Sequence, residues 1–242
     1  MSSGTGTKQY LIRAIGPTLS SFGISGVLAQ PVLTVYSGTS IIASNTIWGN
    51  SNTIATVSLT VGAFALPAAS ADSALVATLS PGSYTAQVIG VGGTTGNALV
   101  EIYEVGSDLT TLANLSTRGQ VAGTSQNLVA GLVVGGTSPI QVLLRGIGPT
   151  LSSFGIASPL ARPILTLYSG TSVIATNSGW SAGTVPAATI AAAESAVGAF
   201  ALPTGSADTA LLMTLAPGTY TVQVSSADGT TGIALVEAYQ VQ

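Results

Sequence analysis

The stretch Arg13-Ala-Ile-Gly-Pro-Thr-Leu-Ser-Ser-Phe-Gly-Ile24 returns almost unchanged as Arg145-Gly-Ile-Gly-Pro-Thr-Leu-Ser-Ser-Phe-Gly-Ile156. Such a long motif, recurring more than a hundred residues later, indicates a tandem repeat. With 242 residues, each half is long enough to bury a core of its own. We therefore expect the same fold twice.

Other landmarks recur in the same order in both halves. The matching pairs are Tyr36 with Tyr168, Trp48 with Trp180, Phe64 with Phe200, Tyr84 with Tyr220 and Glu101 with Glu237. The spacing grows by four residues between Trp180 and Phe200, which predicts an insertion there. We place the first domain at residues 1–106, a linker at 107–113 and the second domain at 114–242.

Short runs rich in β-branched and aromatic residues are separated by turn residues in each half. Lys8–Ile15 ends before Pro17, which has no N–H group for a strand ladder. Ser73–Leu79 and Ser83–Val91 flank the turn residues Pro81-Gly82. Six or seven such runs in each half predict an all-β fold of two tandem antiparallel β-sandwiches, jelly-roll-like in their connections.

One segment breaks this pattern. Residues 186–197 begin with Pro186 and are rich in alanine, which favours a short crossover helix. Ser51–Leu59 is a poorer version of the same segment in the first half. We expect at most one such helix in each domain.

Two strand-like runs, Asn114–Val121 and Asn127–Val134, precede the second motif and have no counterpart before Lys8. If every repeat needs them, one sandwich presents an incomplete edge, which is a template for another chain. Residues 114–134 could complete the domain before them, the domain after them or a neighbouring subunit by strand addition. The residues expected to form this self-association strand are Leu128, Val129, Gly131, Leu132, Val133 and Val134.

Composition excludes several classes of protein. Charged residues are 5% of the chain and the net charge is −3, so there is no basic surface for nucleic acid. No apolar run is long enough for a spanning helix, and we expect no membrane span. The absence of cysteine excludes disulfides and thiolate metal sites. The first residues lack the basic and apolar regions of a signal peptide, so the export route is left open.

Catalysis is not expected. The chain has no histidine, which removes the commonest general base and metal ligand. None of the serines lies in a Gly-x-Ser-x-Gly motif. We predict no enzymatic activity and no cofactor.

Three charged residues recur at equivalent positions in the two halves. They are Arg13, Asp72 and Glu101 in the first half, and Arg145, Asp208 and Glu237 in the second. The carboxylates could serve glycoside hydrolysis or bind Ca²⁺. We favour structural ion pairs, because a chain with so few charges would bury an arginine only with a partner.

Matching aromatic residues also allow two interpretations. Trp48 and Trp180, or Tyr36 and Tyr168, could stack against sugar rings. Aromatic residues at equal positions in a sandwich are more often core anchors, and we favour that role.

The combined motifs resemble a repeat domain of large cell-surface proteins of environmental bacteria. They are Arg-x-Ile-Gly-Pro-Thr-Leu-x-x-Phe-Gly, Pro-Gly-x-Tyr-Thr-x-Gln-Val at Pro81–Val88 and Ala-Leu-Val-Glu-x-Tyr at Ala98–Tyr103. This resemblance covers nearly the whole chain and implies a secreted, multi-copy β-domain without established catalytic residues. The closing strands, Leu215–Val224, also resemble bacterial pre-peptidase C-terminal domains.

These observations predict a structural subunit of an extracellular filament or surface assembly. Its main partner would be a further copy of itself, because apolar surfaces of this extent are usually buried against neighbours. The alternative is a carbohydrate-binding or adhesin module of a larger cell-surface protein, with glycans as partners.

Overall fold

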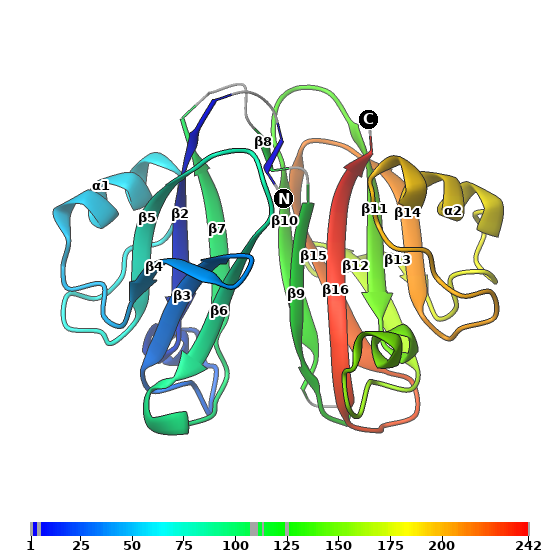
Figure 1. Cartoon of the computed structure of the whole chain (residues 1–242), viewed down its shortest axis with the longest axis horizontal. Helices are drawn as coiled ribbons and strands as arrows, with labels where there is room; N and C mark the ends of the chain where they lie inside the picture. Colours follow the sequence, from blue (N-terminus) through cyan, green and yellow to red (C-terminus); the bar gives the residue numbers. More distant parts are fainter. Residues whose placement is uncertain (1, 4–5, 107–110, 113, 124–125, 242) are drawn as a thin grey trace. The chain divides into compact units, whose positions relative to one another are not determined.

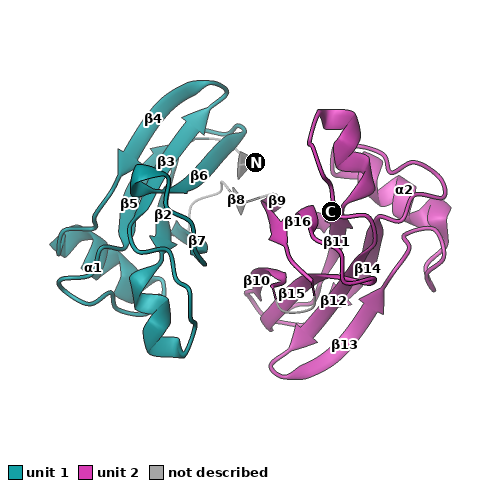
Figure 2. Cartoon of the chain, turned by 90° about the horizontal axis from the view of Figure 1, so that it is seen from below, with its two compact units in different colours: residues 1–113 teal, residues 114–242 magenta. Residues whose placement is uncertain are grey.

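The computed structural model describes residues 2–3, 6–106, 111–112, 114–123 and 126–241. The chain divides into two compact units, unit 1 at Met1–Ala113 and unit 2 at Asn114–Gln242 (Figure 2). Of the expected linker, residues 107–110 and 113 lie outside the described part, and Thr111–Leu112 form strand β8.

Unit 1 holds two three-stranded antiparallel sheets and a short helix (Figure 1). Its elements are β1 (Ser2–Ser3), β2 (Lys8–Ile15), η1 (Pro17–Phe22), β3 (Pro31–Ser37), β4 (Ser40–Asn45), α1 (Asn52–Thr60), β5 (Ser73–Leu79), β6 (Tyr84–Gly90), η2 (Val91–Gly93), β7 (Leu99–Val105) and β8 (Thr111–Leu112). The strand orders are β5-β2-β7 and β4-β3-β6, and β1 pairs with β8 in a small separate sheet.

Unit 2 repeats this arrangement with one extra strand in each sheet. Its elements are β9 (Asn114–Val121), β10 (Leu128–Val134), β11 (Ile140–Ile147), η3 (Pro149–Phe154), β12 (Pro163–Ser169), β13 (Ser172–Asn177), α2 (Ala187–Ala196), β14 (Thr209–Leu215), β15 (Gly218–Ser226) and β16 (Gly232–Val241). The strand orders are β14-β11-β16-β9 and β10-β15-β12-β13. The expected all-β fold of two antiparallel sandwiches is confirmed.

Each unit has two apolar layers. In unit 1, the first layer lies between the sheets and includes Tyr10, Leu33 and Val35. The second lies between α1 and sheet β5-β2-β7 and includes Leu11 and Trp48. Alternate residues of β2 therefore face opposite layers, which explains why seven of its eight residues are buried.

The two helices begin and end as their sequences favour. The Ser51 hydroxyl caps α1 by accepting a hydrogen bond from the Ile54 N–H at 3.4 Å. Helix α2 begins directly after Pro186. Beyond the last turn, Gly62 and Gly198 adopt positive φ values of 73° and 69°, which stop both helices.

The shared motif forms a strand followed by a 3₁₀ turn, and its glycine is required sterically. A Cβ atom on Gly148 would lie 2.1 Å from the backbone oxygen of Leu160. A Cβ atom on Gly16 would likewise lie 2.1 Å from the backbone oxygen of Leu28. The motif therefore determines how closely the 3₁₀ turn approaches the following loop.

Candidate functional site

A buried arginine forms the centre of a polar cluster in unit 2. Arg145 on β11 has no exposed surface and faces Glu237 on the neighbouring strand β16, with which it is in register. Its Nε donates to Glu237 Oε2 at 2.8 Å, and its NH2 donates to the same oxygen at 2.5 Å. Its NH1 donates to the carbonyl oxygen of Phe200 at 2.5 Å.

Unit 1 repeats the cluster around Arg13. Its Nε donates to Glu101 Oε2 at 2.8 Å, and its NH2 also bonds that oxygen. Its NH1 donates to the Phe64 carbonyl oxygen at 2.6 Å. The structure thus brings together Arg13 with Glu101, and Arg145 with Glu237.

Asp72 and Asp208 do not belong to these clusters, which corrects the expectation that they form ion pairs with the arginines. Within the described residues neither makes an ion pair. Asp208 is fully buried and accepts hydrogen bonds from the Gly148 N–H at 2.8 Å, the Thr150 N–H at 3.4 Å and the Thr150 hydroxyl. Asp72 contacts Gly16 and Thr18 in the same way. The physical reason is that N–H groups at the start of a 3₁₀ turn lack partners within the turn.

Unit 2 has a second acid that sequence reasoning missed. Glu194 on α2 is 1% exposed and accepts a hydrogen bond from NH1 of Arg145 at 3.0 Å. The equivalent position in unit 1 is Ser58, so the comparison of the two halves could not reveal it. Burial by itself lowers the pKa of Arg145, but Glu237 and Glu194 outweigh burial and raise that pKa above its usual value.

Two aromatic rings lie close to each guanidinium. In unit 1, the ring centres of Phe64 and Tyr103 lie 4.4 Å and 5.8 Å from Cζ of Arg13. The Tyr103 hydroxyl donates to Glu101 Oε1 at 2.9 Å. Burial raises the pKa of Tyr103 to about 12, with a further contribution from the charge of Glu101. Tyr239 has the same position in unit 2, and burial and Glu237 raise its pKa as well.

These clusters have the character of structural cores. In each unit, Nε and NH2 of the arginine donate to a glutamate carboxylate, and NH1 donates to a backbone carbonyl oxygen. Among the described residues, no three His, Cys, Asp or Glu side chains lie close enough to hold a metal ion. No helix in the described part is long and apolar enough to cross a membrane.

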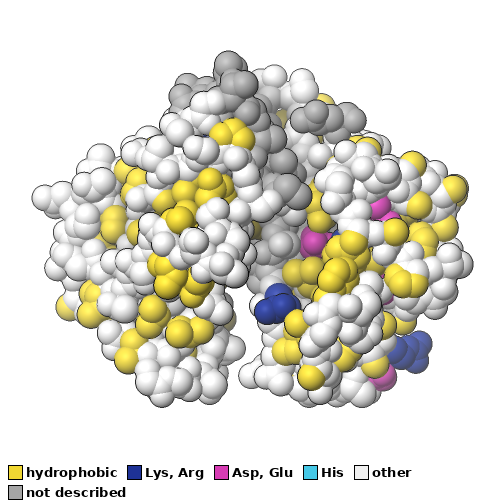
Figure 3. Space-filling view, viewed as in Figure 1, with side chains coloured by type: hydrophobic (Ala, Val, Ile, Leu, Met, Phe, Trp, Pro, Cys, Tyr) yellow, Lys and Arg dark blue, Asp and Glu magenta, His cyan; other side chains and the backbone are white. Residues whose placement is uncertain are grey.

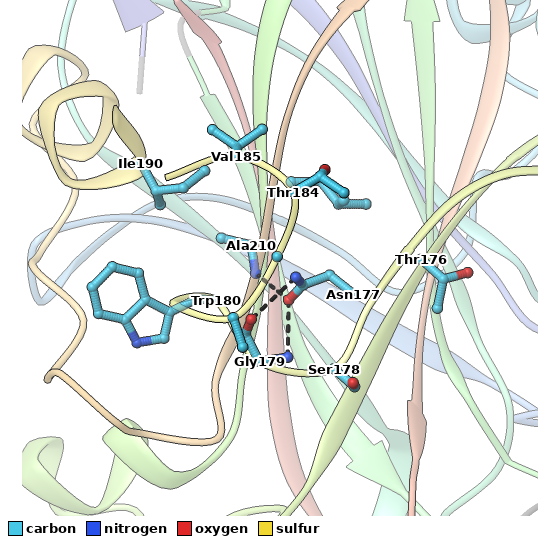
Figure 4. A pocket seen from close by; sticks show the side chains of 12 residues that line it. Thr176, Asn177, Ser178, Gly179, Trp180, Thr184, Val185, Ile190 and Ala210 are labelled. Atoms are coloured by element: carbon cyan, nitrogen blue, oxygen red, sulfur yellow. Dashed lines mark hydrogen bonds between the residues drawn. The ribbon is translucent and has the colours of Figure 1, made fainter. Parts of the chain in front are cut away.

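The two tryptophans do not form a sugar-stacking platform. Trp48 and Trp180 are 8% and 5% exposed. Trp180 borders a pocket under the loop between β13 and α2, where the four-residue insertion lies (Figure 4). The Asn177 side chain in the lining of that pocket is engaged internally, because it bonds Gly179 and the Ala210 N–H. The indole nitrogen of Trp180 donates to the Pro203 carbonyl at 3.1 Å.

The expected self-association strand lies within unit 2. There β10 pairs antiparallel with β15, and β9 pairs antiparallel with β16. Leu128, Leu132 and Val134 pack into the core between the sheets. Val129 and Val133 point outward and are 50% and 71% exposed. A Cβ atom on Gly131 would have no neighbouring atom within 4 Å in this chain.

Unit 1 lacks strands at the equivalent place. In the described part of the chain, β6 pairs only with β3, and β7 pairs only with β2. Both sheets therefore end on the same side of the sandwich, and no described strand pairs with the outer side of β6 or β7. We call these two strands the open edge.

The core is less complete at this open edge. Val88 and Val100 are partly exposed. The equivalent Val224 and Val236 in unit 2, covered by β10 and β9, are 0% and 1% exposed. Ala98 is exposed, whereas its counterpart Ala234 is fully buried. The open edge thus presents both unpaired backbone and apolar side chains.

No family model and no curated protein sequence matches the chain. The structure is similar to the pre-peptidase C-terminal domain of collagenase from Bacillus anthracis, with 13% identity, a TM-score of 0.31, and coverage of 52% of this chain and 88% of that chain. It is also similar to the major capsid protein P2 of bacteriophage PM2, with 8% identity, a TM-score of 0.24, and coverage of 100% and 90%. Scores this low carry no argument about function.

Proposed function

We propose that the chain is a structural subunit of an extracellular filament or surface assembly, which associates with further copies through β-strand edges and apolar surfaces. The single observation that carries this proposal is the open edge of unit 1. Two adjacent sheets end there without a further neighbour among the described strands, and the residues beneath them are apolar and partly exposed. Such an edge favours strand addition by another chain.

The surface supports the same proposal. Figure 3 shows hydrophobic side chains distributed over both units, with few charged ones between them. Exposed aromatic residues recur at equivalent positions, Phe22 in unit 1 and Phe154 in unit 2. A low charge density reduces the repulsion between copies. The extracellular location rests on the resemblance of the repeat to cell-surface repeats.

The alternative is a carbohydrate-binding or adhesin module. Tyr36 and Tyr168 favour it, because each is partly exposed on the side of its strand opposite the core. The burial of both tryptophans removes the larger aromatic platforms, so the assembly proposal has the stronger support.

The test is the size of the purified protein as a function of concentration, measured by light scattering and by negative-stain electron microscopy. We expect growth into ordered assemblies. Ile89→Lys places a charge on β6 at a side chain that is 54% exposed and should prevent growth. Ile42→Lys on β4, at the opposite edge of the same sheet and 44% exposed, is the matched control. A wild-type protein that stays monomeric at high concentration would exclude the proposal.

A further inference from the structure

We infer that the partner of the open edge is the same open edge of a second copy, related to the first by a twofold axis. This inference rests on the proposed self-association and names the surface and the symmetry that it uses. The contact would join β6 to its copy and β7 to its copy. It would be an isologous interface, in which the same residues contribute from both sides, so this contact by itself closes a dimer. Growth beyond the dimer would use the exposed apolar surfaces as a second contact.

The arrangement of the strands makes this pairing possible in both sheets at once. A twofold axis perpendicular to a sheet makes an edge strand run antiparallel to its own copy. Because β6 and β7 end their sheets on the same side of the sandwich, one axis serves both. The two three-stranded sheets of unit 1 would then become continuous six-stranded sheets across the dimer.

The open edge carries none of the usual protection against such pairing. Strand β6, Tyr84–Gly90, contains no charged residue and no proline. On β7, Glu101 is neutralised by Arg13, and Glu104 is paired with Lys8 at 3.2 Å. Exposed edge strands of soluble proteins usually carry free charges, prolines or bulges. At the opposite edge, by contrast, the pairing of β3 with β4 is interrupted by a register shift after Val35.

Unit 2 shows that strands of this sequence accept antiparallel neighbours. Strands β15 and β16 repeat the sequences of β6 and β7 closely, and β10 and β9 pair with them antiparallel over their whole length. A copy of β6 has the same alternation as β10, with apolar Ala86 and Val88 inward. It can therefore cover the partly exposed valines of the open edge as β10 covers Val224 in unit 2.

The test uses the absence of cysteine in the natural chain, which makes single-cysteine variants unambiguous. Thr85→Cys, Gln87→Cys and Ile89→Cys place thiols on the exposed side of β6. Each variant is oxidised alone and in mixture with each of the others, and disulfide-linked dimers are quantified on non-reducing gels. Paired residues of antiparallel strands have Cα atoms about 4.5–5.5 Å apart, within the range of a disulfide.

In a twofold antiparallel ladder, the numbers of any two paired residues add up to the same value. The register of the ladder sets this value. We therefore expect efficient cross-linking only in the combinations whose two residue numbers add up to it, and at least a tenfold lower yield in the others. Gln223→Cys, at the equivalent position in the interior of the sheet of unit 2, is the control and should remain monomeric.

The inference would be overturned if all combinations cross-linked with equal yield. It would also be overturned if no combination cross-linked while the wild type still assembled. Both outcomes leave the proposed function intact. A mixture of Gln87→Cys and Val129→Cys tests whether β6 pairs instead with β10 of another copy. If it cross-links and the β6 variants do not, the open edge binds the β9–β10 edge of another copy instead, which also overturns the twofold pairing. A wild type that shows no association at all would remove the proposed function itself.

Discussion

Glu194 on helix α2 accepts a hydrogen bond from the guanidinium of Arg145 at 3.0 Å, and this contact ties the helix to the sheet beneath it. The other oxygen of Glu194 accepts from the Leu202 N–H at 3.4 Å. In unit 1 the equivalent residue is Ser58, which cannot supply a charge. One copy of the repeat thus holds its arginine with two carboxylates and the other with one.

Arg145→Met should destabilise unit 2 by about 3–5 kcal/mol, because it leaves two carboxylates buried without their cation. The measurement is urea unfolding in a Trp48→Phe background, in which the fluorescence of Trp180 reports unit 2. Arg162→Met is the control. Arg162 is exposed, and its loss should change stability by no more than about 0.5 kcal/mol. Equal effects of the two substitutions would contradict a buried structural cluster.

Asp208→Ala should cost several kcal/mol, because it removes the acceptor of three buried hydrogen bonds from Gly148 and Thr150, and each stranded donor costs about 1–3 kcal/mol. Asp208→Asn keeps one acceptor oxygen and should cost less. Asp228→Ala is the matched control, because Asp228 also accepts from a neighbouring threonine but lies in an exposed turn. Urea unfolding measures the stability of all three variants. If Asp208→Ala left the stability unchanged, the 3₁₀ turn would not depend on this carboxylate.

The clusters show how far the sequence alone could lead. The repetition of arginine, aspartate and glutamate in a charge-poor chain suggested a buried arginine with a carboxylate. It could not distinguish Asp72 from Glu101 as partner of Arg13, because that depends on strand register. Glu101 lies opposite Arg13 across the β2–β7 ladder, whereas Asp72 lies beside the start of the 3₁₀ turn. Glu194 was missed because only one half carries it, although an acid in an alanine-rich helix was a usable signal.

The edge strands show a second limit. Alternation and turn residues predicted strands at residues 114–121 and 127–134, close to the observed β9 and β10. The sequence could not say which unit they join, because the acceptor strands of the two units are nearly identical. That choice depends on the connection from β10 to β11, a property of the folded chain. The crossover helices were predicted from alanine content in one half and by analogy in the other.

Alkaline pH should destabilise the protein through Tyr103. Between pH 10 and about 12, the unfolded chain loses the proton of this tyrosine while the folded chain keeps it, so stability falls as pH rises through that window. Below pH 10, both states are protonated and this residue contributes no pH dependence. Tyr103→Phe should flatten the decline in urea midpoint between pH 9.5 and 11.5. Tyr36→Phe, outside the arginine cluster, is the control, and an unchanged slope in Tyr103→Phe would contradict the burial of this hydroxyl.

Unit 1 should unfold before unit 2 in dilute solution, because its sheets lack a strand each and its core valines are partly exposed. The chain has one tryptophan in each unit, Trp48 and Trp180, so single-tryptophan variants can follow each unit separately. Trp180→Phe leaves Trp48 as reporter of unit 1, and Trp48→Phe leaves Trp180 as reporter of unit 2. We expect the Trp48 transition at the lower urea concentration.

If self-association covers the open edge, the midpoint of the Trp48 transition should also rise with protein concentration, because binding to the folded state stabilises it by mass action. The Trp180 midpoint should change little over the same range, since β9 and β10 already cover the equivalent strands. Ile89→Lys should remove the concentration dependence of the Trp48 transition while Ile42→Lys preserves it. If the Trp48 and Trp180 transitions coincide and neither midpoint changes with protein concentration, the open edge neither weakens unit 1 nor binds a partner.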